Sequence, residues 1–323
     1  MNKLKIVFMG TPDFAVGCLN ALVNSNHNVE AVITAPDRAA GRGKKIIQSE
    51  IKKYTNSNNL RLLQPINLKD EKFINELKSI NADIFVVVAF RMLPKIVWEI
   101  PEKGTINLHA SILPQLRGAA PIHWAIINGL KETGVTTFFI NEKIDFGDVI
   151  EKSKVKIDSS ENTGQLYEKL KTKGSELLLS SLKIIEKNNF KSTKQTNPKE
   201  LLLAPKLNKN NTRINWNNKG ESIFNFVRGL NPYPSAWTKN KKTDKILKLF
   251  NVVFHLEQNN NKNLAGTLLF ENNSIKIITI DGYLEVLELQ LEGKKRMSNL
   301  ESVSYTHLRA HETPEHLVCR LLL

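Results

Sequence analysis

The sequence predicts a doubly wound α/β domain with a mostly parallel sheet, followed by a small domain of antiparallel strands. Apolar segments without polar breaks alternate with helical segments over the first 190 residues, which is typical of parallel strands buried on both faces. A polar stretch rich in Lys and Asn follows. Beyond it, short strand-like segments are separated by Gly, Asn and Asp turns, which indicates a small antiparallel barrel.

The first domain is expected to alternate strands with helices. The segments "LKIVFMG" (4–10) and "ADIFVVVAF" (82–90) are continuous apolar runs, whereas "DEKFINELKSI" (70–80) repeats its apolar residues with a helical period. We expect strands at 4–10, 29–34, 82–90, 104–109, 134–140 and 148–157, and helices at 14–25, 70–80 and 163–187. This order predicts a Rossmann-like sheet.

The second half of the chain has a different pattern. Residues 187–220 are polar and contain Pro198 and Pro205, which favour an extended linker. A helix is expected at 221–230, and strands are expected at 236–240, 245–257, 265–272, 274–280 and 283–293. These short strands predict an OB-like barrel. The expected domains are 1–189, a linker at 190–207, a barrel at 208–301 and a tail at 302–323.

Composition excludes several classes of protein. No apolar run approaches the roughly 18 to 20 residues that a membrane span needs. The first residues lack the small-residue cleavage site of a signal peptide. Two cysteines, Cys18 and Cys319, are too few for a disulfide framework or a metal cluster. We therefore expect a cytoplasmic protein that has no membrane partner and no bound metal. We also expect the protein to be a monomer.

The chain is strongly basic, with 46 Lys and Arg against 32 Asp and Glu and a formal net charge of +14. Residues 191–301 hold 18 basic and 10 acidic residues, so this segment alone has an excess of 8 positive charges. A basic surface attracts polyanions through counterion release. Nucleic acid is therefore one candidate partner, and a Lys-rich composition without such a partner is the alternative.

An Asn and a His lie two residues apart within "INLHASILPQLRGAAPIHWAIING" (106–129). Residues two apart in a strand project from one face, and parallel sheets bind ligands beyond the carboxyl ends of their strands. Asn107 and His109 are therefore candidates for a site at that edge. A later segment, "KIDFGDVI", adds Asp145 and Asp148. An amide donor, a proton carrier and a carboxylate that orients the imidazole suit attack by an amine on a carbonyl carbon.

Each of these residues also has a structural interpretation. A single His at a strand end is more often hydrogen bonded than catalytic, and Asn107 could cap a turn. The "DFG" at 145–147 also occurs in protein kinases, but the chain lacks their glycine-rich loop and has no "HRD" segment ahead of it. Only the joint pattern favours catalysis.

Several segments together resemble the formyltransferase family that uses 10-formyl-tetrahydrofolate. They are "IVFMGTPDFA" (6–15), "NLHASILPQLRGAAPIHWAIING" (107–129) and "TTFFINEKIDFGDVI" (136–150). Two further segments, "APDRAAGRGKK" (35–45) and "APKLNKNNTRINW…VRGLNPYPSAW" (204–237), resemble the members that act on methionyl-tRNA. The resemblance extends from residue 1 to about residue 297.

The resemblance implies a role for each matching residue. The catalytic residues would be Asn107, His109 and Asp145. The residues that contact the folate co-substrate would be Phe90, Arg91, Ser111, Leu113, Pro114 and Asp148. The residues that contact initiator methionyl-tRNA would be Arg38, Arg42, Lys44, Lys45 and Arg117, with the Pro36–Lys45 loop flexible before the tRNA binds. No metal is implied.

The chain departs from the family pattern in three places. Arg91 follows Phe90 where many members have a Tyr-Gly pair, and Phe146 replaces a small or hydroxyl residue, so that it would crowd the site. Residues from about Ser302 onward change abruptly in composition, and we interpret them as a tail that is not native to the fold. Two alternatives stay open, a relative that formylates a small amine such as a sugar nucleotide or ribonucleotide, and a non-catalytic RNA-binding relative.

Overall fold

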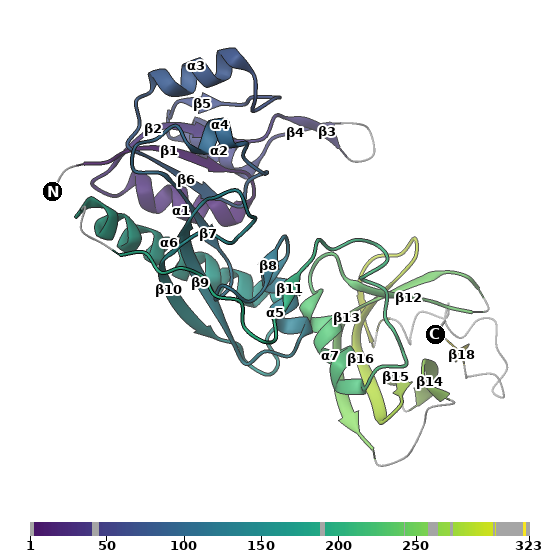
Figure 1. Cartoon of the computed structure of the whole chain (residues 1–323). Helices are drawn as coiled ribbons and strands as arrows, with labels where there is room; N and C mark the ends of the chain where they lie inside the picture. The colour runs from purple at the N-terminus through teal and green to yellow at the C-terminus, as the bar shows by residue number, and fades with distance from the viewer. Residues whose placement is uncertain are drawn as a thin grey trace. The chain divides into compact units, whose positions relative to one another are not determined.

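The computed structural model describes residues 3–40, 45–187, 191–241, 243–257, 264–271, 274–299, 301 and 319–320. The chain forms two compact units, and each is described by itself (Figure 1). The first unit comprises Met1–Gly118, Glu132–Lys156 and Tyr167–Leu203, and the second comprises Ala119–Lys131, Ile157–Leu166 and Ala204–Leu323.

A seven-stranded sheet forms the centre of the first unit, in the order β10-β9-β7-β6-β1-β2-β5. Its strands are β1 (Lys5–Gly10), β2 (Asn28–Ile33), β5 (Leu62–Leu63), β6 (Ile84–Val88), β7 (Thr105–His109), β9 (Glu132–Phe139) and β10 (Val149–Lys156). The strands from β7 to β5 pair in parallel, whereas β9 pairs antiparallel with β7 and β10. The predicted mostly parallel sheet is confirmed.

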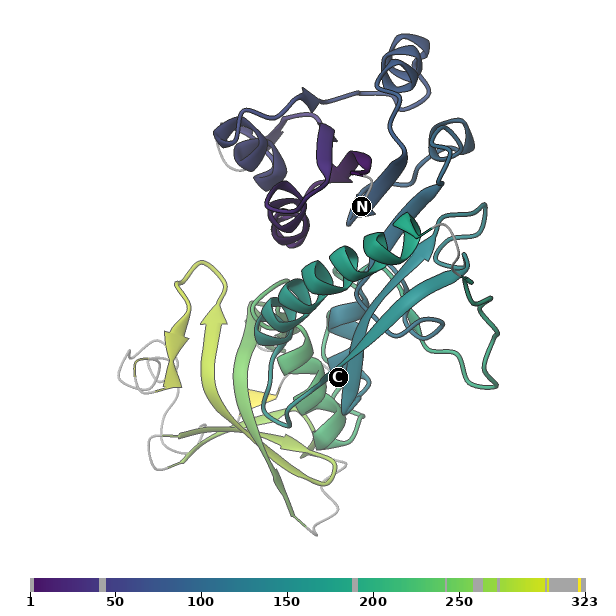
Figure 2. The same cartoon turned by 90° about the vertical axis from the view of Figure 1, so that its left-hand side faces the viewer.

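Helices cover both faces of this sheet (Figures 1 and 2). They are α1 (Asp13–Val23), α2 (Glu50–Ser57), α3 (Glu71–Ser79), α4 (Lys95–Trp98) and α6 (Thr163–Glu186). Phe73 and Leu77 of α3 pack against alternate residues of β1 and β6 on one face. On the other face, Leu108 of β7 lies so close to α6 that a Cβ added at Gly174 would be 2.8 Å from it. The doubly wound arrangement is therefore confirmed.

Several short elements differ from the sequence-based expectation. The Pro36–Lys45 segment does not consist of irregular loop alone, because β3 (Arg38–Ala40) pairs antiparallel with β4 (Lys45–Ile47). The range 110–129 contains the helix α5 (Pro121–Ile127), which begins at a proline because the first position of a helix needs no N–H partner. Two short strands are β8 (Arg117–Gly118) and β11 (Leu203–Ala204). Residues 191–203 of the expected linker belong to the first unit.

The second unit is a curled antiparallel sheet with helices α5 and α7 (Gly220–Gly229) (Figure 2). Its strands are β12 (Ala236–Lys239), β13 (Ile246–Leu256), β14 (Thr267–Glu271), β15 (Ser274–Thr279), β16 (Gly282–Leu291), β17 (Met297–Ser298) and β18 (Cys319–Arg320). The strand order is β12-β13-β16-β15-β14-β18, with β17 beside β16. Trp216 and Val227 lie in its core. The predicted small antiparallel domain is confirmed, and most of the predicted tail at 302–323 lies outside the described residues.

Candidate active site

Strand β7 places Asn107 and His109 on the same face of the first unit's sheet. Leu108 between them faces α6, so the two polar side chains project from the opposite face. His109 is buried, whereas Asn107 is half-buried and its amide makes no hydrogen bond to another described residue. The sheet therefore presents one fixed imidazole and one uncommitted amide at the carboxyl end of a parallel strand.

The loop after β7 is held by side chains from two neighbouring strands. Thr136 Oγ1 donates a hydrogen bond to the Ser111 carbonyl over 2.7 Å and accepts one from the Leu113 N–H. Lys152 Nζ donates to the Leu113 carbonyl over 2.6 Å, and burial lowers the pKa of Lys152. The Ser111 hydroxyl donates to the Gln115 carbonyl. These bonds fix the backbone beside His109.

The His109 ring is oriented from both of its nitrogens. Nε2 lies 2.8 Å from the Leu116 carbonyl oxygen, which can only accept, so this nitrogen carries a proton. Nδ1 lies 3.9 Å from Asp145 Oδ2, and the two side chains are 8% and 12% exposed. The same carboxylate oxygen accepts a hydrogen bond from the Gly118 N–H over 3.0 Å. The Nδ1 side of the ring therefore faces the Asp145 carboxylate, and the Nε2 side faces the Leu116 carbonyl.

A tight turn between β9 and β10 presents Asp145. Its backbone has φ +52°, a left-handed conformation that few residues with a Cβ adopt. Gly147 follows, and a Cβ there would lie only 1.5 Å from the Phe139 carbonyl oxygen. Glycine at this position lets the turn close against β9 and bring the Asp145 carboxylate to His109.

Arg117 lies at the edge of the same turn. Its guanidinium donates to Gln195 Oε1 over 2.7 Å and to Asn197 Oδ1 over 3.0 Å. It also lies over the Phe146 ring, 4.2 Å from the ring centroid. Burial lowers the pKa of Arg117, and the charge of Asp145 opposes this shift. The Phe146 ring therefore provides a surface on which the Arg117 guanidinium packs.

The structure connects the other predicted folate residues to the scaffold in different ways. Phe90 packs half-buried at the edge of the core beneath α3. The Arg91 guanidinium donates to the carbonyls of Pro65 and Ile66, and burial, followed by the charge of Arg38, lowers the Arg91 pKa. Leu113, which precedes Pro114, is buried against Phe138 and Val149. Asp148 accepts a hydrogen bond of 3.5 Å from Ser192.

The predicted RNA contacts are described only in part. Arg38 lies on β3 with an exposed side chain. The backbone of Lys45 lies in β4, but its side chain, together with Arg42 and Lys44, lies outside the described residues. Among the predicted tRNA contacts, the structure describes the side chains of Arg38 and Arg117, and both residues belong to the first unit.

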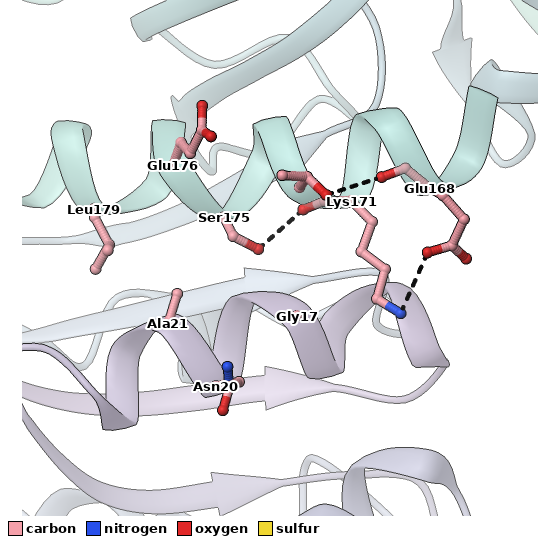
Figure 3. A pocket seen from close by; sticks show the side chains of 9 residues that line it. Gly17, Asn20, Ala21, Glu168, Lys171, Ser175, Glu176 and Leu179 are labelled. Carbon is pink, nitrogen blue, oxygen red and sulfur yellow. Dashed lines mark hydrogen bonds and ion pairs between the residues drawn. The ribbon is translucent and has the colours of Figure 1, made fainter. Parts of the chain in front are cut away.

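A hollow of about 340 Å³ lies between α1 and α6 (Figure 3). Gly17 and Asn20 line it from α1, and Lys171 and Ser175 line it from α6. Lys171 forms ion pairs with Asp13 and Glu168 there. Because α6 covers the face of β7 opposite His109, this hollow is separate from the cluster described above.

Sequence reasoning missed three residues that organise the cluster, namely Thr136, Lys152 and Gln195. Thr136 could have been found from its place opposite His109 on a neighbouring strand. Lys152 and Gln195 lie in segments rich in exposed polar residues, and nothing in their sequence context distinguishes them.

Across the described residues, no group of three or more His, Cys, Asp or Glu side chains could hold a metal ion. In the same part of the chain, no helix combines the length and the apolar character that crossing a membrane requires.

Comparison with known proteins finds relatives that match over most of the chain. The chain is 50% identical over 303 residues to the methionyl-tRNA formyltransferase of Flavobacterium johnsoniae, covering 93% of this chain and 96% of that protein. It is 45% identical over 307 residues to the enzyme of the same name from Bacteroides thetaiotaomicron, covering 93% and 95%.

Solved structures share the fold at lower identity. The sugar 3N-formyl transferase WlaRD, solved with dTDP and 5-N-formyl-THF, has a TM-score of 0.63 and 21% identity over 91% of this chain and all of its own. HypX from Aquifex aeolicus, solved with tetrahydrofolic acid, has a TM-score of 0.63 and 19% identity, and this chain spans 47% of its length. Residues 4–182 match the family described as formyl transferase, and residues 206–304 match the formyl transferase C-terminal domain. The chain belongs to the formyl transferase family.

Proposed function

We propose that this chain transfers a formyl group from 10-formyl-tetrahydrofolate to the amino group of methionyl initiator tRNA. The observation that carries the proposal is the placement of Asn107 and His109 on one face of β7, with the Asp145 carboxylate 3.9 Å from the imidazole. The amine substrate is proposed from the relatives named methionyl-tRNA formyltransferase, whose similarity extends over more than nine tenths of the chain.

In the proposed reaction the methionyl nitrogen attacks the formyl carbon, and the carbonyl oxygen takes up negative charge. The Asn107 amide, which has no partner among the described residues, donates to this oxyanion. The His109 imidazolium donates from Nδ1, because Nε2 is committed to Leu116. Asp145 stabilises the imidazolium and helps to accept the proton that the amine loses. The bond from carbon to the donor nitrogen then breaks, and that nitrogen takes up a proton.

The pterin part of the donor would lie against the fixed loop after β7. Pro114 offers apolar surface beside the buried Leu113, on a backbone that Thr136 and Lys152 hold in place. We propose that Ser111 shapes this loop through its bond to Gln115. Phe90, Arg91 and Asp148 are proposed to contact the donor at the ends of β6 and the Asp145 turn.

The positively charged segments are proposed to bind the tRNA. Arg38, Arg42, Lys44 and Lys45 would contact the acceptor end, and Arg117 would position the aminoacyl group near the imidazole. The excess of 8 positive charges in residues 191–301 would contribute phosphate contacts that are independent of base sequence.

We further propose that the protein is a cytoplasmic monomer. Its proposed domains are residues 1–189 and 208–301, joined by a linker at 190–207 and followed by a non-native tail at 302–323.

The test measures transfer of labelled formyl from 10-formyl-tetrahydrofolate to initiator methionyl-tRNA. His109→Ala should reduce kcat by about a hundredfold to a thousandfold, the effect typical of losing one oxyanion donor. Arg42→Ala should mainly raise the KM for tRNA. His255→Ala, which removes a half-exposed imidazole from β13, serves as the matched control and should retain parental kcat. Formylation of an amino sugar nucleotide in preference to methionyl-tRNA would contradict the proposal, and so would tRNA binding without turnover.

A further inference from the structure

Gln195 differs from its neighbours in the polar segment after α6. Residues 191–200 are all described, and Gln195 is the one member of this range whose side chain is not exposed. Its amide points back toward the turn that carries Asp145. A residue that turns inward from an otherwise solvated segment has a specific partner.

The Gln195 amide uses both its donor and its acceptor groups. Nε2 donates to the carbonyl oxygens of Asp145 and Gly147, over 3.1 Å and 2.8 Å. Oε1 accepts from Arg117 Nη2 over 2.7 Å and from Arg117 Nε over 3.3 Å. Of the uncharged side chains, only a primary amide presents two N–H donors and a carbonyl acceptor at one tip. Gln195 therefore connects the Asp145 turn to Arg117.

The turn has features that such an external connection would stabilise. Asp145 has φ +52°, a conformation that costs energy for a residue with a Cβ. Its carboxylate has to meet both the Gly118 N–H and the His109 ring. The two carbonyls that Gln195 holds flank Phe146, whose ring lies beneath Arg117. Both ends of the turn are thus fixed by one side chain.

We infer that Gln195 is a positioning residue, which holds the Asp145 turn so that the carboxylate faces His109 and at the same time holds Arg117 over Phe146. This inference rests on the proposed formyl transfer for its effect on rate. The inference also says that Gln195 determines how the Asp145 turn lies beside the His109 imidazole. This part does not depend on the identity of the substrate.

Two substitutions separate the two connections. Gln195→Met keeps the length of the side chain but removes every hydrogen bond. Gln195→Glu keeps an acceptor for Arg117 but places a carboxylate against the two turn carbonyls. We expect both variants to lose about tenfold to a hundredfold in kcat. The KM for methionyl-tRNA should rise only in Gln195→Met, because the Glu variant retains Arg117. Thr196→Ala, an exposed neighbour, is the matched control and should retain both constants.

A second measurement needs no substrate. The ring nitrogen signals of His109, followed by NMR with ¹⁵N-labelled histidine in the full chain, should shift in both Gln195 variants and stay parental in Thr196→Ala. Unchanged signals would overturn the inference even if kcat falls, because the loss would then arise elsewhere, and a kcat within twofold of the parent in both variants would also overturn it. If Gln195→Met melts at a lower temperature than the parent, the kcat and the His109 signals of Gln195→Glu alone test the inference. A parent that formylates no methionyl-tRNA would refute the proposed function, while the imidazole signals would still decide the role of Gln195.

Discussion

Replacing Asp145 by Asn should remove most of the turnover while leaving the fold intact. The amide has the shape of the carboxylate, and its oxygen can still accept the hydrogen bond from the Gly118 N–H. The turn should therefore keep its conformation. The change removes the negative charge that faces the His109 ring, which the proposed mechanism requires in its protonated form.

The size of the effect follows from the geometry. Opposite charges at the observed 3.9 Å attract each other by about 4 kcal/mol at an effective dielectric constant of about 20. Both side chains are nearly buried, so screening by solvent is small. Because each 1.36 kcal/mol corresponds to about tenfold in rate, about a thousandfold is the upper bound. Relaxation around the new amide reduces the loss, and we expect kcat to fall about a hundredfold to a thousandfold.

The assay is formyl transfer at saturating folate and methionyl-tRNA, with thermal melting of each variant alongside. Glu142→Gln is the control, since it removes one negative charge from the same loop at an exposed position paired with Lys95. It should change kcat by less than about twofold. An Asp145→Asn enzyme that melts like the parent and keeps kcat within threefold would show that the charge of Asp145 does not support the reaction.

Three further predictions concern stability. Gly147→Ala should lower the free energy of unfolding by more than about 2 kcal/mol in urea denaturation, because the new Cβ meets the backbone of Phe139 at 1.5 Å. Gly220→Ala should lower the free energy of unfolding by less, about 1 to 2 kcal/mol, because its Cβ meets the Phe254 ring, which can rotate. A loss in Gly220→Ala that equals or exceeds the loss in Gly147→Ala would contradict this order. Burial raises the pKa of the Cys18 thiol from 9.0 to about 12, so unfolding above pH 9 releases a proton that the native state retains. The free energy of unfolding should therefore fall by up to about 1.4 kcal/mol per pH unit from pH 9 upward. Cys18→Ala should reduce this slope in urea titrations at pH 8 and 10.5, and the rest remains because burial also raises the pKa of Tyr167 to about 12.

The sequence alone predicts the long elements of the fold and the centre of the site. Runs such as residues 82–90 contain no polar break, so their assignment as buried strands depends on little else. The spacing of Asn107 and His109 fixes their common face, because strand side chains alternate whatever the tertiary context. The meeting of Asp145 with His109 does not follow from strand pairing, because the last residue of β9, Phe139, lies opposite Ile106 and only the turn after β9 brings the carboxylate to the imidazole.

Long-range contacts account for what the sequence does not predict. From sequence alone, Pro121 is ambiguous, because proline marks loops and also occurs at the first position of a helix such as α5. From sequence, Lys152 resembles any solvated lysine on a strand. Its role in holding the loop is seen only from its hydrogen bond to the Leu113 carbonyl. Gln195 lies 50 residues beyond Asp145 in a polar stretch, and no local pattern marks the one amide that turns inward.

The hydrogen bonds around His109 also limit where a proton can move. Nε2 is committed to the Leu116 carbonyl and Asp145 Oδ2 to the Gly118 N–H, so Nδ1 and the second carboxylate oxygen remain for transfer. The Asn107 amide makes no bond within the described part of the chain, and it projects from the same face as the imidazole. In the proposed mechanism these groups meet the developing oxyanion without first breaking a bond to the protein. Such donors act without reorganisation, which makes preorganised electrostatic stabilisation effective. In the proposed mechanism, the backbone partners of His109 and Asp145 therefore contribute to catalysis by occupying Nε2 and Oδ2 before the substrates arrive.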